Sequence, residues 1–124
     1  MLQTADVGIL GERAARQFLR RLGYRILARN HRSSAGEIDL IAMDGDVVVF
    51  AEVKTRTSRS GADPEANIAA GQIGRISRAA QRFLLSSGAG DWPARLDVLT
   101  VMLAPDGPPK VEHFKSAFPL GGRR

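Results

Sequence analysis

Three residues in the middle of the sequence have side chains that could carry out metal-assisted chemistry. Asp39 lies in the apolar segment Glu37–Met43, and Glu52 and Lys54 lie near the end of the next one, Val47–Thr55. Carboxylates that are brought together repel each other, and a bound divalent cation removes that repulsion. Oxygen ligands of this kind suit Mg²⁺ or Mn²⁺. A lysine two residues after a carboxylate points the same way along a strand, where it could orient a water or stabilise charge on a phosphate.

Whether the two carboxylates meet depends on the turn between the two segments. The sequence Asp44-Gly45-Asp46 between apolar runs is a strong β-hairpin signal. If the first two of these residues form the loop, Met43 pairs with Asp46, and Asp39 and Glu52 become diagonal neighbours on one face. A four-residue loop has the same result, whereas a three-residue loop puts the acids on opposite faces unless a bulge intervenes. A carboxylate cluster therefore requires an even loop.

The elements that would position these residues follow from hydrophobic periodicity and turn signals. A helix is expected from Thr4 or Asp6 to about Leu22, and a second one over residues 68–85. Strands are expected over residues 24–29, 37–43, 47–55 and 95–103, with a short edge strand over 111–114, a turn over 31–36 and a polar loop over 56–66. The second helix connects the third and fourth strands, which predicts that this pair is parallel.

Both helices offer polar residues to the same region. Glu12 lies about 20° from Leu19 on a helical wheel, at the edge of the apolar stripe. Arginines 13, 16 and 20 lie on the adjoining face, where a phosphate backbone could approach. Gln72 is a long polar residue inside the apolar arc of the second helix, and a buried amide needs hydrogen-bond partners. Each of these features also has a plainer interpretation. Glu52 and Lys54 could be a solvated ion pair, and Glu12 could be an acid that the helix dipole favours near the start of the helix. The arginines could form ordinary solvated helix faces.

The composition limits the class of protein. The 124 residues include 18 Lys and Arg, 13 Asp and Glu, and no Cys, with a net charge of +5. This length fits one domain, expected over residues 1–120 with a flexible basic tail over 121–124. The absence of Cys excludes a disulfide scaffold and a thiolate metal site, and the positive charge favours a polyanionic partner such as nucleic acid. The longest apolar run is too short to cross a membrane and no signal peptide is recognisable, so the expected location is the cytoplasm.

Five motifs occur in an order that resembles a known family. They are Gly11-Glu12-x-x-Ala15, Gly36-Glu37-Ile38-Asp39-Leu40-Ile41, Phe50-Ala51-Glu52-Val53-Lys54-x-Arg56, Arg95-Leu96-Asp97-Val98 and His113-Phe114-x-x-Ala117-Phe118. Together they resemble the YraN-like family of small bacterial proteins. That family is similar to the PD-(D/E)xK nuclease superfamily and, within it, to Holliday-junction resolvases. The resemblance extends from about Gly8 to Phe118.

The resemblance implies a fold and an activity. The fold is a single α/β domain with an αβββαβ restriction-endonuclease-like core, in which a mixed central sheet is flanked by helices. The activity is Mg²⁺- or Mn²⁺-dependent hydrolysis of phosphodiester bonds, with structure-selective action on DNA. The sequence departs from the superfamily pattern in having Ile38 before Asp39 instead of proline. It departs from the family pattern in having Gly71 where a lysine is common. This difference removes the residue that would contact a phosphate from the second helix and leaves the metal site unaffected.

The resemblance, together with the positions of the charged residues, suggests roles for individual residues. The expected metal ligands are Asp39 and Glu52, with the backbone carbonyl of Val53 and the carboxylate of Glu12 as further candidates. Lys54 would be the catalytic lysine, and Glu37 and Gln72 would support the site. The arginines expected to bind the nucleic-acid backbone without reading sequence are Arg13, Arg16, Arg56, Arg59 and Arg75. A homodimer would suit a symmetric substrate. The rival interpretations are a non-catalytic nucleic-acid-binding module and a protein-interaction scaffold.

Overall fold

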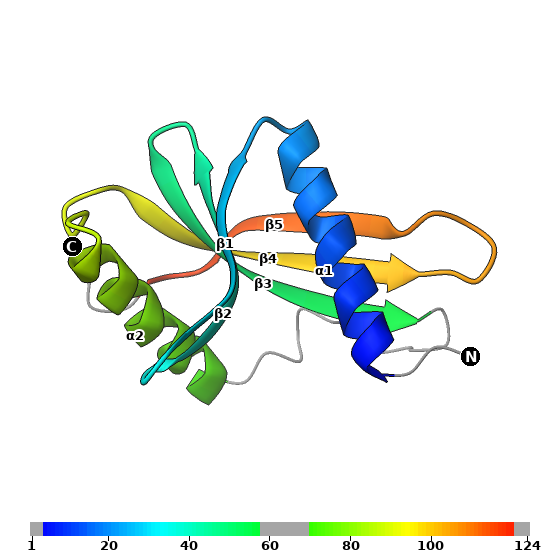
Figure 1. Ribbon diagram of the computed structural model, residues 1–124, viewed down its shortest axis with the longest axis horizontal. Coiled ribbons are helices and arrows are strands. Elements are labelled where there is room, and N and C mark those ends of the chain that lie inside the picture. Colours follow the sequence, from blue (N-terminus) through cyan, green and yellow to red (C-terminus); the bar gives the residue numbers. More distant parts are fainter. Residues whose placement is uncertain (1–3, 58–69, 121–124) are drawn as a thin grey trace.

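A five-stranded mixed sheet carries one helix on each face (Figure 1). The computed structural model describes residues 4–57 and 70–120. The elements are, in chain order, α1 (Thr4–Arg21), β1 (Arg25–Ser33), β2 (Gly36–Asp44), β3 (Val47–Thr57), α2 (Ala70–Ser86), β4 (Ala94–Leu103) and β5 (Lys110–Phe118). The strands lie side by side in this same order, with β3 and β4 parallel and all other neighbours antiparallel. The predicted α/β fold and the parallel pair are confirmed.

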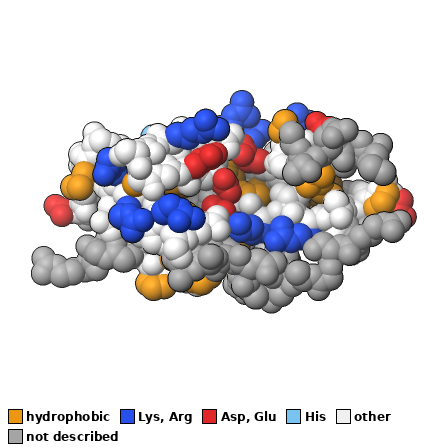
Figure 2. Space-filling view, turned by 90° about the horizontal axis from the view of Figure 1, so that it is seen from below, with side chains coloured by type: hydrophobic (Ala, Val, Ile, Leu, Met, Phe, Trp, Pro, Cys, Tyr) orange, Lys and Arg blue, Asp and Glu red, His pale blue; other side chains and the backbone are white. Residues whose placement is uncertain are grey.

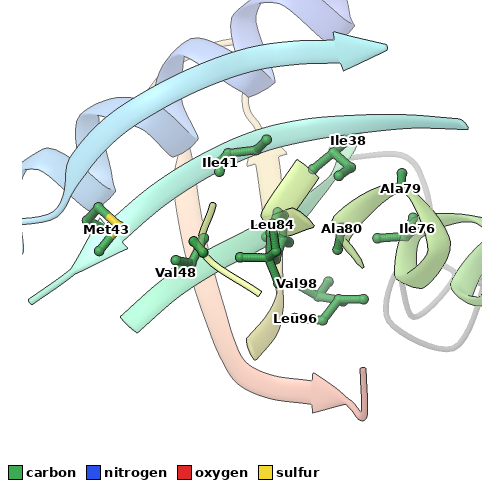
Figure 3. Close-up of a cluster of buried hydrophobic side chains, with 12 residues drawn as sticks. Ile38, Ile41, Met43, Val48, Ile76, Ala79, Ala80, Leu84, Leu96 and Val98 are labelled. Atoms are coloured by element: carbon green, nitrogen blue, oxygen red, sulfur yellow. The ribbon is translucent and has the colours of Figure 1, made fainter. Parts of the chain in front are cut away.

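Each face of the sheet buries its own apolar cluster, because the central strands are apolar on both sides. The α1-side core consists of Ala15, Leu19, Tyr24, Leu40, Ala42, Val49, Ala51, Leu99 and Val101. The α2-side core consists of Ile38, Ile41, Met43, Val48, Phe50, Ile76, Ala79, Ala80, Leu84, Ala89, Leu96 and Val98 (Figure 3). Strand β3 supplies both clusters by simple alternation. No helix formed by the described residues is long and apolar enough to cross a membrane.

The edge strands are longer than predicted. Residues 31–33, expected in a turn, continue β1, and the chain reverses at Ser34 and Ala35, with Ser33 paired to Gly36. Strand β5 has nine residues instead of the expected four, because Phe114 and Phe118 pack against the α2-side core. The tail over 121–124, most of the polar loop and the predicted start of the second helix lie outside the described residues.

The β2–β3 hairpin has a two-residue loop, as the even-loop argument requires. The loop is Gly45-Asp46, however, and not Asp44-Gly45, since Asp44 pairs with Val47. Gly45 has a φ of +58°, a left-handed conformation that glycine adopts without steric cost. The register is therefore shifted from the predicted one. The ladder ends at the Leu40–Ala51 pair, so Asp39 and Glu52 lie beyond it and are not the diagonal neighbours that the predicted register makes them.

A buried carboxylate ties the C-terminal strands to the rest of the sheet. Asp97 on β4 is fully buried and accepts hydrogen bonds from Arg95 Nε (2.9 Å), the His113 ring (2.7 Å) and the Ser116 backbone N–H (2.9 Å). Arg95 also donates to Asp44 and to the Tyr24 hydroxyl, which links the hairpin and the end of α1. Burial alone would raise the pKa of Asp97, but the bonds from His113, Arg95 and Ser116 hold it below its usual value.

This network predicts a large effect of Asp97→Asn on stability. Replacing the charge leaves Arg95 without its main buried partner, so we expect the free energy of unfolding at pH 7 to fall by about 3 kcal/mol or more. Because the folded-state pKa is lowered, the stabilising contribution is present above the unfolded-state pKa of about 3.9 and disappears as the pH falls through the folded-state value. Urea unfolding should therefore give different free energies of unfolding for the wild type and Asp97→Asn at pH 7, and similar values only in acid. The control is Asp106→Asn in the exposed β4–β5 turn, and a loss no larger than in this control would contradict the prediction.

Candidate active site between β2 and β3

The candidate site lies where β2 and β3 diverge. Their ladder ends at the Leu40–Ala51 pair. Beyond it, β3 continues beside β4, from the Glu52–Val98 pair to the Thr57–Leu103 pair. The Asp39 carboxylate accepts a hydrogen bond of 2.8 Å from the Val53 backbone N–H, a group that the β2–β3 ladder no longer uses. A side chain thus replaces the backbone ladder and leaves a gap between two central strands.

Asp39 reaches this gap because the side-chain alternation of β2 breaks beside it. Ile38 and Ile41 both belong to the α2-side core, although residues three apart on a regular strand face opposite sides. Leu40 belongs to the α1-side core, and Asp39 lines a pocket beneath α1. The prediction that Asp39 and Glu52 lie on one face of the sheet is therefore wrong, because a regular pleat does not persist through Asp39 and Glu52 bonds Gln72 on the α2 side.

Strand β1 has a matching irregularity. Asn30 has a φ of +50°, which asparagine tolerates better than most residues. Arg29 and Asn30 both line the pocket beneath α1, whereas Ala28 packs against the α2-side core and His31 contacts Phe83 of α2 edge to face. Two consecutive side chains therefore point to the α1 side at the level of Asp39.

Glu52 meets Asp39 from the other side of the sheet. The Glu52 side chain is 8% exposed, Gln72 Nε2 of α2 donates to its Oε2 over 2.6 Å, and Lys54 Nζ lies 3.2 Å from the same oxygen. Burial, the Glu52 carboxylate and a hydrogen bond between the two carboxyl groups raise the pKa of Asp39 to about 7, against the opposing bond from Val53. The two acids thus form a pair that holds a proton more tightly than separate carboxylates would.

Glu12 is close to this pair, but other residues hold it. Its carboxylate accepts hydrogen bonds from Arg16 (3.0 Å) on the next turn of α1 and from Asn30 (3.2 Å) on β1. Burial raises the pKa of Glu12 against the effect of Arg16, and the charge of Asp39 raises it further. Among the described residues, no three Asp, Glu, His or Cys side chains are placed to hold one metal ion together. The predicted set of Asp39, Glu52 and Glu12 is therefore not assembled in this arrangement.

The pocket beneath α1, which we call the α1 pocket, has a volume of about 550 Å³. The part of its lining that α1 supplies is Gly8, Ile9, Glu12, Arg13 and Arg16. The part that the strands supply is Arg29, Asn30, Asp39, Val53 and Thr55. Seen from below the view of Figure 1, acidic side chains gather in the middle of the molecule, and Lys and Arg side chains lie on two sides of them (Figure 2).

The remaining predicted site residues lie outside the acid pair. Glu37 is exposed and lies 3.7 Å from Arg32, and Arg56 is half-buried and donates to the Thr55 carbonyl. Arg75 is exposed on α2, and Arg59 lies outside the described residues. Gln72 bonds Glu52, which answers the sequence argument that this amide needs a partner.

Sequence reasoning missed three residues of the site. For Asn30 and Arg29 one signal was available, namely an asparagine directly after the strand predicted over residues 24–29, because asparagine adopts left-handed conformations more readily than most residues. Gly11 is the third, and it sets how closely α1 approaches the sheet. A Cβ on Gly11 would lie 1.9 Å from Thr55 Oγ1 and 2.7 Å from Thr55 Cβ. The glycine therefore lets α1 lie close to β3, which brings the neighbouring Glu12 near the sheet, where it bonds Asn30.

Fold and site together define a small α/β protein with a buried acid pair and a lysine in a gap of its central sheet. A model of "Uncharacterised protein family UPF0102" matches residues 11–101, and the chain belongs to this family, which confirms the YraN-like resemblance. A UPF0102 protein of Symbiobacterium thermophilum is 46% identical over 90% of this chain and 95% of its own length. Relatives in Anaeromyxobacter dehalogenans (42%, over 94% and 87%) and Geobacter sulfurreducens (41%, over 92% and 89%) are similarly close.

The close approach of α1 predicts opposite effects for the same substitution at two helix positions. Gly11→Ala should lower the free energy of unfolding by about 1–3 kcal/mol, because overpacking against Thr55 outweighs the gain in helix propensity. Gly8→Ala is the matched control, since a Cβ there meets nothing within 4 Å, and it should raise stability by about 1 kcal/mol. Urea unfolding measures both. Combining Gly11→Ala with Thr55→Ala should recover part of the loss, and equal effects at the two glycines would contradict the packing argument.

Proposed function

We propose that this protein hydrolyses phosphodiester bonds of nucleic acid in a reaction that depends on a divalent cation. The observation that carries the proposal is the convergence of Asp39, Glu52 and Lys54 in the gap between β2 and β3. Two carboxyl groups in mutual contact, one of them with a raised pKa, are unfavourable in an apolar sheet and are typical of functional sites. The resemblance to resolvase-like nucleases favours structure-selective DNA as the substrate class.

The donor set suits a hard cation. Asp39 and Glu52 offer carboxylate oxygens, and the N–H and C=O groups of a strand residue point to the same side, so the Val53 carbonyl also faces the gap. Mg²⁺ or Mn²⁺ bound by these groups would supply Lewis acidity and neutralise charge at the phosphate. In the structure, Glu12 is committed to Arg16 and Asn30 and is better placed to support the site than to bind the cation directly.

Two further residues orient the Glu52 carboxylate and place a positive charge beside it. Gln72 donates to Oε2 and orients the carboxylate, while Lys54 places a positive charge 3.2 Å from the same oxygen. The Lys54 ammonium has two further N–H groups, which can hold a water or a phosphate oxygen beside the acids. Positive charge at that point favours the additional negative charge that develops on a phosphate during hydrolysis.

A second candidate function has its own supporting observation. Gln72 and Lys54 already bind the Glu52 carboxylate, so this acid has partners without a cation. A nucleic-acid-binding module that lacks catalysis is consistent with that arrangement, because the arginines around the α1 pocket would still hold a phosphate backbone. The two candidates differ in one measurable respect, which is turnover.

We expect purified protein to cleave at least one of branched, flapped, single-stranded or duplex DNA when Mg²⁺ or Mn²⁺ is present. Glu52→Gln keeps the shape of the side chain and removes its charge, and Lys54→Met removes the ammonium. Each should reduce the cleavage rate by about 10²-fold or more. Gel analysis of end-labelled substrates measures the rate.

The matched controls lie on the exposed edge strand β5. Glu112→Gln and Lys110→Met make the same chemical changes at exposed positions and should leave the rate unchanged. Binding without cleavage of any substrate would reject catalysis in favour of the binding module. Cleavage that persists in Glu52→Gln would place the active centre elsewhere.

Cation binding can be tested without any substrate. A ligand that binds only the folded protein stabilises it, by about 2.7 kcal/mol at a concentration 100 times the dissociation constant. Saturating Mn²⁺ should therefore raise the melting temperature of the wild type. Asp39→Asn, which keeps an oxygen for the Val53 N–H, should abolish the rise, whereas Asp106→Asn should preserve it. An equal rise in all three proteins would show that the cation binds outside the acid pair.

A further inference from the structure

The α1 pocket has a composition that the acid pair does not explain. Asp39 is the residue that joins the two, since it lines the pocket while its carboxyl group is engaged with Val53 and Glu52. The pocket volume of about 550 Å³ is in the range of sites for small molecules. What fills such a space follows from the charges and the shape of its walls.

The charges of the α1 pocket are unbalanced. Arg13, Arg16 and Arg29 line it together with two acids, Glu12 and Asp39, and the Asp39 carboxyl group is engaged with Val53 and Glu52. The Arg16 side chain is 13% exposed, and burial together with the charges of the neighbouring arginines lowers its pKa against the effect of Glu12. Among residues 4–57 and 70–120, neither Arg13 nor Arg29 forms an ion pair. An anion bound between these guanidinium groups would relieve their repulsion.

The walls of the α1 pocket leave room for more than an anion. Gly8 lines it, and a Cβ built there meets nothing within 4 Å, so no packing contact requires a glycine at this helix position. Glycine is among the least favourable residues in a helix interior. Next to it, Ile9 is 59% exposed and gives the rim an apolar surface. The pocket therefore combines anion-binding side chains, open space and an apolar edge.

We infer that the α1 pocket is a subsite for one nucleotide of an unpaired nucleic-acid strand, whose phosphate is bound by Arg13, Arg16 and Arg29. The sugar and base would occupy the space over Gly8 and Ile9. Because Asp39 forms the inner wall, the next phosphate along the strand would lie toward the acid pair. This inference rests on the proposed function and names the form of substrate that the site takes.

An unpaired strand fits this pocket better than a duplex for a physical reason. A duplex carries its phosphates on a continuous outer surface, and a nucleotide enters a pocket from a duplex only after unstacking and unpairing, which costs free energy. A nucleotide in a single strand or a flap has already lost its pairing. The guanidinium groups inside the pocket can then bind its phosphate with charge-assisted hydrogen bonds.

The test measures binding of a 5′-phosphorylated single-stranded oligonucleotide on the order of ten nucleotides long, and of the duplex of the same sequence. Fluorescence anisotropy is recorded with a chelator present, so that no cleavage occurs. We expect tighter binding of the single strand. Arg29→Gln and Gly8→Leu should each weaken that binding about tenfold, the first by removing a charge-assisted contact and the second by filling the space.

Two matched controls accompany these variants. Arg21→Gln removes one charge at the end of α1, outside the pocket, and should weaken binding by no more than about threefold. Gln17→Leu places the same new side chain on an exposed part of α1 outside the α1 pocket and should bind like the wild type. Gly8→Leu improves helix propensity, so its unfolding curve separates a blocked pocket from a failure to fold.

The outcomes separate this inference from the catalytic proposal. If Arg29→Gln and Arg21→Gln weaken the binding of single strand and of duplex to the same extent, the arginines of the pocket act as a general basic surface. That result would overturn the inference. Normal single-strand binding by a well-folded Gly8→Leu would overturn it as well. A protein that shows the expected binding but cleaves nothing keeps the subsite and loses the catalytic proposal. Normal cleavage of unpaired strands by Gly8→Leu would keep the catalytic proposal and reject the subsite.

Discussion

The hydrogen bond from the Val53 N–H to the Asp39 carboxylate is the interaction on which the site depends. In a continuous sheet that N–H would meet a backbone carbonyl of β2, and no side chain could enter between the strands. The Asp39 side chain satisfies it instead, which allows β2 and β3 to separate without leaving an unpaired buried donor. The gap that results admits the carboxyl groups of Asp39 and Glu52 from the two sides of the sheet.

The same sheet contains a second acid that shows what a purely structural carboxylate looks like. Asp97 is fully buried, yet hydrogen bonds from Arg95, His113 and Ser116 lower its pKa, so its charge stabilises the fold. Asp39 has an acid as its neighbour, and burial together with that neighbour raises its pKa to about 7. The neighbours therefore distinguish the two roles. Asp97 has the Arg95 guanidinium beside it, whereas Asp39 has another carboxyl group beside it, and a cation bound at Asp39 would remove the repulsion between the two acids.

Much of this arrangement follows from the sequence, and the part that does not has identifiable causes. The apolar run of β3 and the crossover through α2 were enough to predict a central strand with a parallel neighbour. The even hairpin loop was predicted, but its position was wrong by one residue, because both Asp44-Gly45 and Gly45-Asp46 offer turn residues. The break in alternation at Asp39 and Asn30 was missed, since it depends on a tertiary hydrogen bond and on a left-handed residue that no local pattern requires. The length of β5 likewise depends on tertiary contacts, those of Phe114 and Phe118 with the α2-side core and those of His113 and Ser116 with Asp97.

Helix α1 lies beside both the acid pair and the arginines of the α1 pocket. Two glycines of this helix differ in how closely they are packed. Gly11 is packed so tightly on Thr55 that a methyl group has no room, and this contact fixes the height of Glu12 above the sheet. Gly8, one turn earlier, faces open space in the α1 pocket. Packing explains the first glycine and leaves the second unexplained.

Helix α1 therefore performs two tasks. Its C-terminal part buries Ala15 and Leu19 in the core, and its N-terminal part keeps a space open beside three arginines. Because the acids act in the gap and the arginines act in the pocket, substitutions can affect cleavage and strand binding separately, although Asp39 belongs to both.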